Sequence, residues 1–456
     1  MSEALRCNPD RPTRALLVNK RMETTMPLEI HRVTSDDIGS RRSTLAGRLV
    51  GALALTAMLF GAAPVTADDG RWVGTWTASP QPIWGADFAF PTKIPATVKD
   101  QTFRQIVRIS LGGARLRLVF SNTYGDGPLT IGAVSVAPAG QQGTVSSSAI
   151  RMLTFGGKRS VAIPPGAPAV SDPVDMAADD QSRLAVSIFL PGETRLSTFH
   201  WDGRQTAWFG KGDLTLAGDF PATETTDARV LLTDVLADTP NHGAVAVIGD
   251  SITDGNGATV DADARWPDFL AKRLAPRHVA VLNAGISGAR LLEDKMGVNA
   301  AARLDRDVLS QPNVRALIVL IGINDISWPG TAFASQAKRP SADAMIAGYR
   351  QLIALARARN IRVIGATLTP FDGALSGTPL DGYYDADKDA LRKEVNRWIR
   401  ESGAFDAVVD FDALLRDPDN NARIAPAFDS GDHLHPGDKG NMAMAEAIDL
   451  ETLLGH

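Results

Sequence analysis

The first half of the chain contains short segments in which apolar and polar residues alternate. Residues 105–110 and 114–120 both alternate, and Gly112-Gly113 between them predicts a two-residue hairpin turn. Further strand candidates, separated by turns rich in Gly, Pro, Asp and Asn, are residues 129–136, 160–163, 184–190, 206–209 and 230–236. Because no run has a clear helical period, we predict an all-β, sandwich- or jelly-roll-like domain over residues 68–240.

After residue 240 the period changes, and apolar runs alternate with amphipathic stretches. The apolar runs, each of strand length, are residues 244–248, 279–282, 316–321, 361–368 and 407–409. The amphipathic stretches predict helices at residues 266–274, 301–309, 342–359, 388–401 and 438–454. Alternation of this kind predicts a second domain over residues 241–456, with a five-stranded parallel sheet between two layers of helices.

Residues 1–67 differ from the rest of the chain. Basic residues up to Arg48 lead into an uncharged apolar run at residues 49–67, which ends in small side chains. This order predicts a leader and signal peptide cleaved after Ala67, and therefore a secreted or periplasmic protein. The alternative is a membrane anchor. Gly and Pro within the run disfavour a continuous spanning helix, so we expect no stable membrane span in the mature chain.

Composition removes several classes of protein. The chain has 456 residues, a net charge of −5 and a single cysteine, Cys7, which lies in the leader. A disulfide scaffold, a cysteine-ligated metal and a thiol nucleophile are therefore not expected. The mild acidity provides no basic surface for nucleic acid.

Polar residues follow the predicted parallel strands, where such sheets bind their ligands. Ser251 follows the first apolar run, Gly288 the second and Asn324 the third, while Asp432 and His435 come after the fifth. The topology therefore predicts that all five lie at one edge of the sheet.

These residue types suit acyl transfer. A serine hydroxyl needs an adjacent base, histidine is the usual one, and a carboxylate must orient the ring. Asp432 and His435 are three residues apart, so one tight turn can bring them together, and Pro436 stiffens the backbone there. His433 is the competing histidine, and we expect it at the rim of the site.

The same residues resemble the conserved blocks of the SGNH (GDSL-type) hydrolase superfamily. Gly249-Asp-Ser-Ile-Thr253 is similar to its first block, with Ile252 where the name-giving motif has Leu. Gly288, Asn324 and the Asp432–His435 segment are similar to later blocks, so the resemblance covers residues 241–456. The upstream segment Trp72-Val-Gly-Thr-Trp-Thr77 resembles the N-terminal domain of some secreted two-domain members.

The resemblance implies a flavodoxin-like α/β/α fold and a role for each residue. Ser251 is the implied nucleophile, His435 the base and Asp432 the acid that orients it. The implied oxyanion hole consists of the backbone N–H groups of Ser251 and Gly288 and the side-chain amide of Asn324.

Rival motifs fit less well. Thr253 replaces the second glycine of a G-x-S-x-G elbow, and no glycine-rich phosphate loop follows the first strand. His433, His435 and Asp429 could suggest a metal site, but no further histidine is expected on that edge. We therefore predict neither a metal nor a cofactor.

Four functional hypotheses remain open at this point. The leading one is a secreted serine esterase acting on a small-molecule, lipid or glycan ester. The others are an acyltransferase with the same triad, a glycan O-acetylesterase whose β domain binds carbohydrate, and a non-catalytic glycan-binding protein. The β domain either binds glycans or only shapes the rim of the pocket, and the oligomeric state is open.

Overall fold

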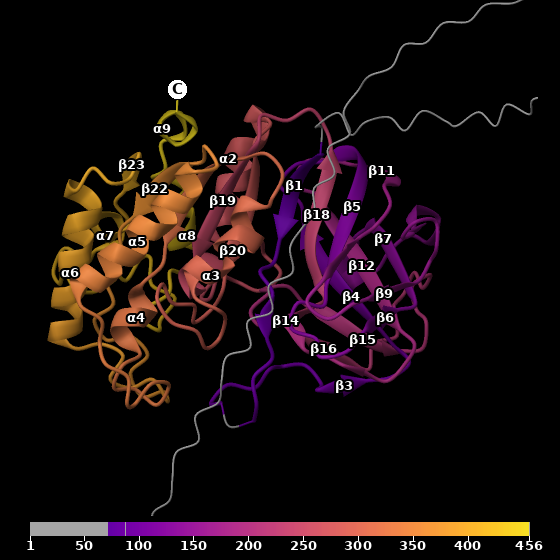
Figure 1. Cartoon of the computed structure of the whole chain (residues 1–456), viewed down its shortest axis with the longest axis horizontal. Coiled ribbons are helices and arrows are strands. Elements are labelled where there is room, and N and C mark those ends of the chain that lie inside the picture. The colour runs from indigo at the N-terminus through magenta and orange to yellow at the C-terminus, as the bar shows by residue number, and fades with distance from the viewer. Residues whose placement is uncertain (1–71, 87, 456) are drawn as a thin grey trace, which may run out of the picture. The chain divides into compact units, whose positions relative to one another are not determined.

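Two antiparallel sheets form the first half of the described chain, the β-rich region (Figure 1). The structure is a computed structural model that describes residues 72–86 and 88–455, so the predicted cleavage site after Ala67 lies outside the described residues. The first sheet has the order β1 (Trp72–Thr77), β18 (Leu232–Asp238), β5 (Gly113–Ser121) and β10 (Pro168–Val170), with β11 (Val174–Ala178) also paired to β5. The second has the order β16 (Glu224–Thr226), β15 (Ala207–Lys211), β4 (Gln101–Arg108), β12 (Arg183–Leu190), β7 (Ala133–Pro138) and β8 (Arg151–Met152).

Three smaller sheets complete the β-rich region. They pair β13 (Thr194–Arg195) with β3 (Thr97–Val98), β14 (Thr198–His200) with β17 (Arg229–Val230) and β2 (Gln81–Pro82), and β6 (Leu129–Ile131) with β9 (Val161–Ile163). The expected all-β character of this region is confirmed. In β5, Leu116, Leu118 and Phe120 are fully buried and alternate with more exposed residues, as one buried sheet face requires.

The predicted hairpin at Gly112-Gly113 is wrong. β4 pairs with β12 and β15, whereas β5 pairs with β18, β10 and β11, so the two strands lie in different sheets. The chain crosses between the sheets just after β4: the N–H of Ile109 donates to Ser182 O, and the next N–H, of Ser110, donates to Thr75 O. A Cβ at Gly112 would lie 2.0 Å from Ala178 O, so the glycine permits a close backbone crossing and does not form a two-residue turn.

A five-stranded parallel sheet forms the second half of the described chain, the α/β domain. Its order is β20 (Ala280–Gly285), β19 (Ala244–Gly249), β21 (Val314–Leu320), β22 (Arg362–Ala366) and β23 (Ala407–Val409). Numbered along the chain this is 2-1-3-4-5, the flavodoxin-like order, and the expected fold is confirmed.

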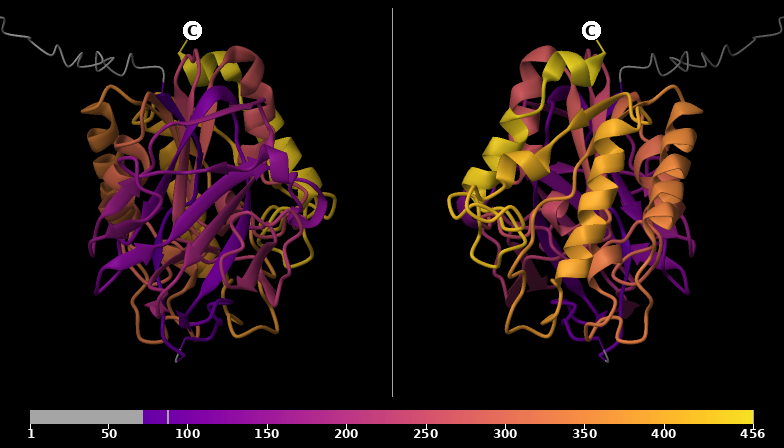
Figure 2. Two further views of the ribbon diagram at one scale, coloured as in Figure 1. Left: turned by 90° about the vertical axis from the view of Figure 1, so that its right-hand side faces the viewer. Right: turned by 90° about the vertical axis from the view of Figure 1, so that its left-hand side faces the viewer.

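Helices cover both faces of this sheet (Figure 2). Val245 and Val247 of β19 belong to one hydrophobic cluster and Ala246 and Ile248 to another, because successive side chains of a strand point to opposite faces. The first cluster includes α2 (Trp266–Leu274), α7 (Phe411–Leu415), α8 (Asp438–Glu446) and α9 (Leu450–Leu454). The second includes α3 (Ala300–Leu304), α5 (Ala342–Arg357) and α6 (Ala386–Glu401).

The short helices α1 (Ser251–Asp254) and α4 (Ile323–Ser327) directly follow strands of the sheet. The helix expected at residues 301–309 consists of α3 and a π-helical turn at Asp305–Leu309. The single helix expected at residues 438–454 is wrong, because Asp449 interrupts it by accepting the N–H groups of Glu451 and Thr452 and so begins α9.

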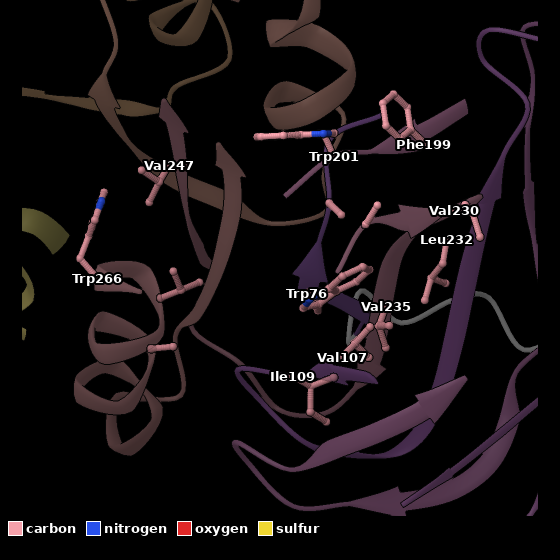
Figure 3. Packing of buried hydrophobic residues seen from close by; sticks show 14 of the residues in the cluster. Trp76, Val107, Ile109, Phe199, Trp201, Val230, Leu232, Val235, Val247 and Trp266 are labelled. Atoms are coloured by element: carbon pink, nitrogen blue, oxygen red, sulfur yellow. The ribbon is translucent and has the colours of Figure 1, made fainter. Parts of the chain in front are cut away.

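The β-rich region and the α/β domain share one core. β18 ends at Asp238 and β19 begins at Ala244, yet residues from both sides belong to one buried cluster (Figure 3). Trp76 and Val235 come from the first region, and Val247 and Trp266 from the second. Shared burial of this kind can hold loops of one region firmly against the other. Across the part of the chain that the structure describes, no helix is both long and apolar enough to span a membrane.

Candidate active site

The structure brings Ser251, His435 and Asp432 into one hydrogen-bonded chain. Ser251 begins α1 directly after β19, and its Oγ lies 2.7 Å from His435 Nε2. His435 Nδ1 lies 2.6 Å from Asp432 Oδ2. A carboxylate can only accept, so Nδ1 carries the proton, and Nε2 is then free to accept from the hydroxyl of Ser251.

A tight turn holds Asp432 against the ring. Its Oδ1 accepts the backbone N–H groups of Leu434, at 2.9 Å, and His435, at 2.8 Å. Burial raises the pKa of Asp432, but the hydrogen bond and charge of His435 outweigh it, and the net pKa is well below the usual range. Asp432 is therefore ionised wherever the imidazole titrates.

His433 faces away from this chain of hydrogen bonds. Its Nδ1 lies 2.5 Å from Asp429 Oδ2, and its side chain is 45% exposed, against 7% for His435. The two histidines that sequence spacing had to choose between thus have different carboxylate partners, and only His435 contacts Ser251.

Three potential donors converge near Ser251: its own N–H, the N–H of Gly288 and the amide of Asn324. All three residues line the same cleft. Among the residues that the structure describes, no acceptor bonds to either backbone N–H. Gly288 has φ of +77°, and a Cβ there would lie 2.3 Å from Met296 Sδ, so the position requires glycine.

Tyr383 fixes the orientation of Asn324. The tyrosine hydroxyl donates to Asn324 Oδ1 at 2.8 Å, and Asn324 Nδ2 donates to Ala289 O at 2.9 Å, which leaves one amide hydrogen for the cleft. Burial raises the pKa of Tyr383 well above its ordinary value, so it remains a donor. Sequence reasoning missed Tyr383, which lies 59 residues away in a loop with no motif.

Two buried carboxyl groups flank these residues in the sequence. Asp250 Oδ1 accepts the N–H of Ile252 at 3.0 Å, and burial raises the pKa of Asp250 to about 7. Asp325 accepts the N–H groups of Leu291 and Leu292 at 2.7 and 2.8 Å, and burial raises its pKa to about 6. Asp325 thereby ties helix α4, which carries Asn324, to the segment that follows Gly288.

The cleft beside Ser251 has a volume of about 290 Å³ and a largely apolar lining. The β-rich region contributes Phe90 and Trp201, whose rings stack with centroids 5.5 Å apart at 16°. The α/β domain contributes Met296, Trp328 and Phe333. The sequence carried no signal for this lining, because its members come from separate loops of both regions.

A third histidine–carboxylate pair, His200 with Asp254, joins the β-rich region to the α/β domain. His200 is buried, and its Nε2 lies 2.8 Å from Asp254 Oδ1. Within residues 72–86 and 88–455, no group of three or more His, Cys, Asp or Glu side chains is arranged to hold a metal ion.

Comparison with known proteins identifies the α/β domain. Residues 247–443 match the model of the GDSL-like Lipase/Acylhydrolase family, so this part of the chain is similar to that family. No curated protein matches the chain.

Several solved structures are similar to the same part of the chain. An inhibitor-bound aryl esterase of M. smegmatis is 19% identical over 46% of this chain and 100% of its own, with a TM-score of 0.37. A carbohydrate acetylesterase from Sinorhizobium meliloti is 17% identical over 45% of this chain and 95% of its own, with a TM-score of 0.35. A GDSL-like lipase from Bacteroides thetaiotaomicron is 17% identical over 46% of this chain and 88% of its own, with a TM-score of 0.35.

Proposed function

We propose that this chain is a serine esterase that hydrolyses carboxylic esters through an acyl-enzyme, with Ser251 as nucleophile. The observation that carries the proposal is the contact of 2.7 Å between Ser251 Oγ and His435 Nε2, with Asp432 on the other ring nitrogen. A hydroxyl, a base and an orienting carboxylate in this order are what nucleophilic acyl transfer needs.

In the first half of the reaction, Ser251 Oγ attacks the ester carbonyl carbon while His435 Nε2 takes the hydroxyl proton. The negative charge that develops on the carbonyl oxygen is stabilised by the N–H groups of Ser251 and Gly288 and by the free amide hydrogen of Asn324. The intermediate collapses when His435 returns the proton to the leaving alkoxide. The products are an alcohol and an acyl group on Ser251.

In the second half, His435 removes a proton from water, which attacks the acyl carbon. Collapse releases the carboxylic acid and restores the hydroxyl of Ser251. Asp432 stays ionised throughout and stabilises the imidazolium in both halves. The chemistry requires no metal or cofactor.

The cleft supports esters with a small apolar or aromatic group. Its volume of about 290 Å³ is modest, and Phe90, Trp201 and Trp328 present flat apolar surfaces to it. Because two of these side chains come from the β-rich region, we assign that region, residues 68–240, a role in shaping the cleft. The catalytic domain is then residues 241–456.

Export after cleavage near Ala67 is part of the proposal and rests on the sequence of residues 1–67.

The proposal is tested by comparing wild type with Ser251→Ala on p-nitrophenyl acetate. The variant should keep its melting temperature and lose kcat by a factor on the order of 10³–10⁶. A serine-directed fluorophosphonate should label the wild type at Ser251 and leave the variant unlabelled. Full activity in Ser251→Ala would refute the assignment.

Three further measurements refine the proposal. Activity falling steeply from acetate to palmitate esters would support the small cleft. Activity that survives EDTA would support chemistry without a metal. Ester formation in the presence of a competing alcohol would indicate acyl transfer in place of hydrolysis.

A further inference from the structure

His200 is held on both ring nitrogens in the interior of the protein. Its Nδ1 lies 3.0 Å from the backbone oxygen of Ser79, and its Nε2 lies 2.8 Å from Asp254 Oδ1. Its residue surface is only 5% exposed. The pair joins the two halves of the chain, because His200 ends β14 and Asp254 ends α1.

The hydrogen-bond partners fix the protonation of this pair. A backbone carbonyl can only accept, so Nδ1 must carry a proton. Asp254 Oδ2 accepts both the N–H of Ser287, at 2.7 Å, and its hydroxyl, at 2.9 Å, and these bonds favour an ionised carboxylate. Nε2 must then also carry a proton, and the pair is an imidazolium with a carboxylate. Burial lowers the pKa of His200, but the charge and hydrogen bond of Asp254 outweigh it, so the net pKa is raised.

Asp254 connects this histidine to the oxyanion donors. It lies three residues after Ser251 and anchors the backbone of Ser287, the residue that precedes Gly288. The Ser287–Gly288 peptide unit carries the Gly288 N–H, a donor to the oxyanion in the proposed mechanism, so the placement of this N–H depends on where Ser287 is held.

The two residues that follow His200 also lie at the cleft or contact the segments that form it. Trp201 lines the cleft, and Asp202 Oδ2 accepts from Asn256 Nδ2 at 3.1 Å and lies 3.3 Å from the hydroxyl oxygen of Ser287, whose proton goes to the nearer Asp254. Three consecutive residues of the β-rich region thus contact the cleft or the segments that build it. A region that served only as a separate binding module would have no need of such contacts.

We infer that His200 is a positioning residue of the ester-hydrolysing site, whose imidazolium holds Asp254 and thereby sets the Ser287–Gly288 backbone for the oxyanion. The inference rests on the function proposed above. It makes the β-rich region a working part of the active site, because the cation comes from that region and the oxyanion donors come from the α/β domain.

The test is His200→Gln, assayed on p-nitrophenyl acetate with active sites counted by fluorophosphonate. Glutamine retains a donor for Asp254 but removes the positive charge, so the buried carboxylate loses the cation that is hydrogen-bonded to it. We expect kcat per active site to fall on the order of 10- to 100-fold, the scale of a small misplacement of reacting groups. KM should change by less than about 2-fold, because ground-state binding in the cleft is untouched.

A boronic acid provides a readout that a purely structural residue would not affect. Phenylboronic acid bonds to the serine oxygen and places a boronate oxygen where the oxyanion forms. Its inhibition constant should therefore rise in parallel with the loss of kcat. Asp254→Asn, which lets a neutral His200 accept an amide hydrogen while an oxygen remains for Ser287, should lose less kcat than His200→Gln.

Gln311→Ala is the matched control. Gln311 Nε2 donates to Asp234 Oδ1 at 2.6 Å, which is also a bond between the β-rich region and the α/β domain, but neither residue lines the cleft. This variant should lower the melting temperature and leave kcat and the boronate inhibition constant at their wild-type values.

The possible outcomes separate this inference from the proposed function. If wild type turns over and His200→Gln changes only the melting temperature or the active fraction, as in the control, the inference is overturned alone. If wild type hydrolyses no ester of the series and Ser251 is not labelled, the proposed function is overturned and the inference with it. Should His200→Gln fail to fold, the double variant with Asp254→Asn removes the unpaired charge; a smaller but parallel loss of kcat and of boronate affinity supports the inference, and wild-type values of both overturn it.

Discussion

The α/β domain and the β-rich region each contribute one buried histidine that faces an aspartate, and the two pairs differ in what the second ring nitrogen meets. Counted over the whole residue, each of the two histidines is 5% exposed. At His435 the second nitrogen faces the hydroxyl of Ser251, at 2.7 Å, whereas at His200 it faces the carbonyl of Ser79, at 3.0 Å. A hydroxyl can give up its proton to the ring, but a carbonyl cannot. With equal burial and equal acid partners, the proposal thus makes one histidine a proton carrier and the other the holder of a fixed charge.

The two pairs also differ in how the chain builds them. Asp432 and His435 are three residues apart in one turn of the α/β domain, while His200 and Asp254 are 54 residues apart and come from different regions. In the proposed mechanism, the reacting groups thus come from local turns after strands, and the groups that hold them in place come from distant segments. Variants of the two kinds should therefore differ in how much kcat they lose.

The largest loss is expected when the local pair is broken. Asp432→Asn leaves the shape of the turn but presents the wrong tautomer of His435 to Ser251, and kcat should fall by about 10⁴. His435→Gln should cost at least as much. Both losses should exceed that of His200→Gln when kcat is measured per fluorophosphonate-reactive site. Equal losses at His200 and His435 would erase the distinction between a proton carrier and a fixed charge.

The next effect concerns the oxyanion. Asn324→Ala should lower kcat with little change in KM, because the amide contacts the oxygen mainly in the transition state. The expected cost is about 2.7–4 kcal/mol, the scale of one oxyanion donor. A rise in KM alone, in steady-state kinetics on the same ester, would mean that Asn324 binds substrate and does not belong to the oxyanion hole.

Stability against pH should distinguish the two carboxyl groups on either side of the serine–histidine contact. The pKa of Asp250 is raised from 3.8 to about 7, so the native state binds the extra proton and stability should fall as pH rises from 3.8 to 7. The pKa of Asp432 is lowered, so its contribution is present above 3.8 and is lost as pH falls toward its native pKa.

Urea unfolding of wild type and Asp250→Asn between pH 4 and 8 measures this difference. The asparagine keeps an oxygen for the N–H of Ile252 and has no carboxyl to titrate, so the decline with pH should be shallower. Part of the decline should remain, because the pKa of Asp325 is also raised, to about 6. An equal slope in both proteins would show that Asp250 titrates normally.

A smaller effect is expected at Tyr383, which supports Asn324 as His200 supports Asp254. Tyr383→Phe removes only the hydroxyl that fixes Asn324 Oδ1. The loss of one neutral hydrogen bond, ~0.5–1.5 kcal/mol, predicts a decrease in kcat of about 2- to 12-fold. The boronate inhibition constant should rise by the same factor, and an unchanged constant would place Tyr383 outside the support of Asn324.

The smallest effect is expected at His433. It is half exposed, and its ring contacts Asp429 at the edge of the loop. His433→Ala should therefore leave both kcat and the acid limb of the kcat/KM profile as in wild type. Loss of the acid limb in this variant, but not in His435→Gln, would show that the wrong histidine was chosen.

The sequence pattern predicted a parallel sheet covered by helices and the five residues Ser251, Gly288, Asn324, Asp432 and His435 that meet at its edge, whereas the flavodoxin-like strand order was implied only by the family resemblance. The pattern could do so because each strand of a sheet covered on both faces is a continuous apolar run, and because the residues after such strands are brought together by topology. The contact of Asp432 with His435 needed only one turn of chain. A short stretch of sequence was therefore sufficient to predict each of these features.

Only the tertiary structure decided which distant segments meet. The pattern around Gly112 was that of a hairpin, yet β4 and β5 entered different sheets, since alternation specifies a buried face and not a partner strand. His200, Tyr383 and Trp201 had no motif, because their roles depend on loops that packing of the shared core brings to the cleft. Turn and strand preferences are encoded over a few residues, whereas these contacts arise from burial summed over the whole core, which no short window of sequence contains.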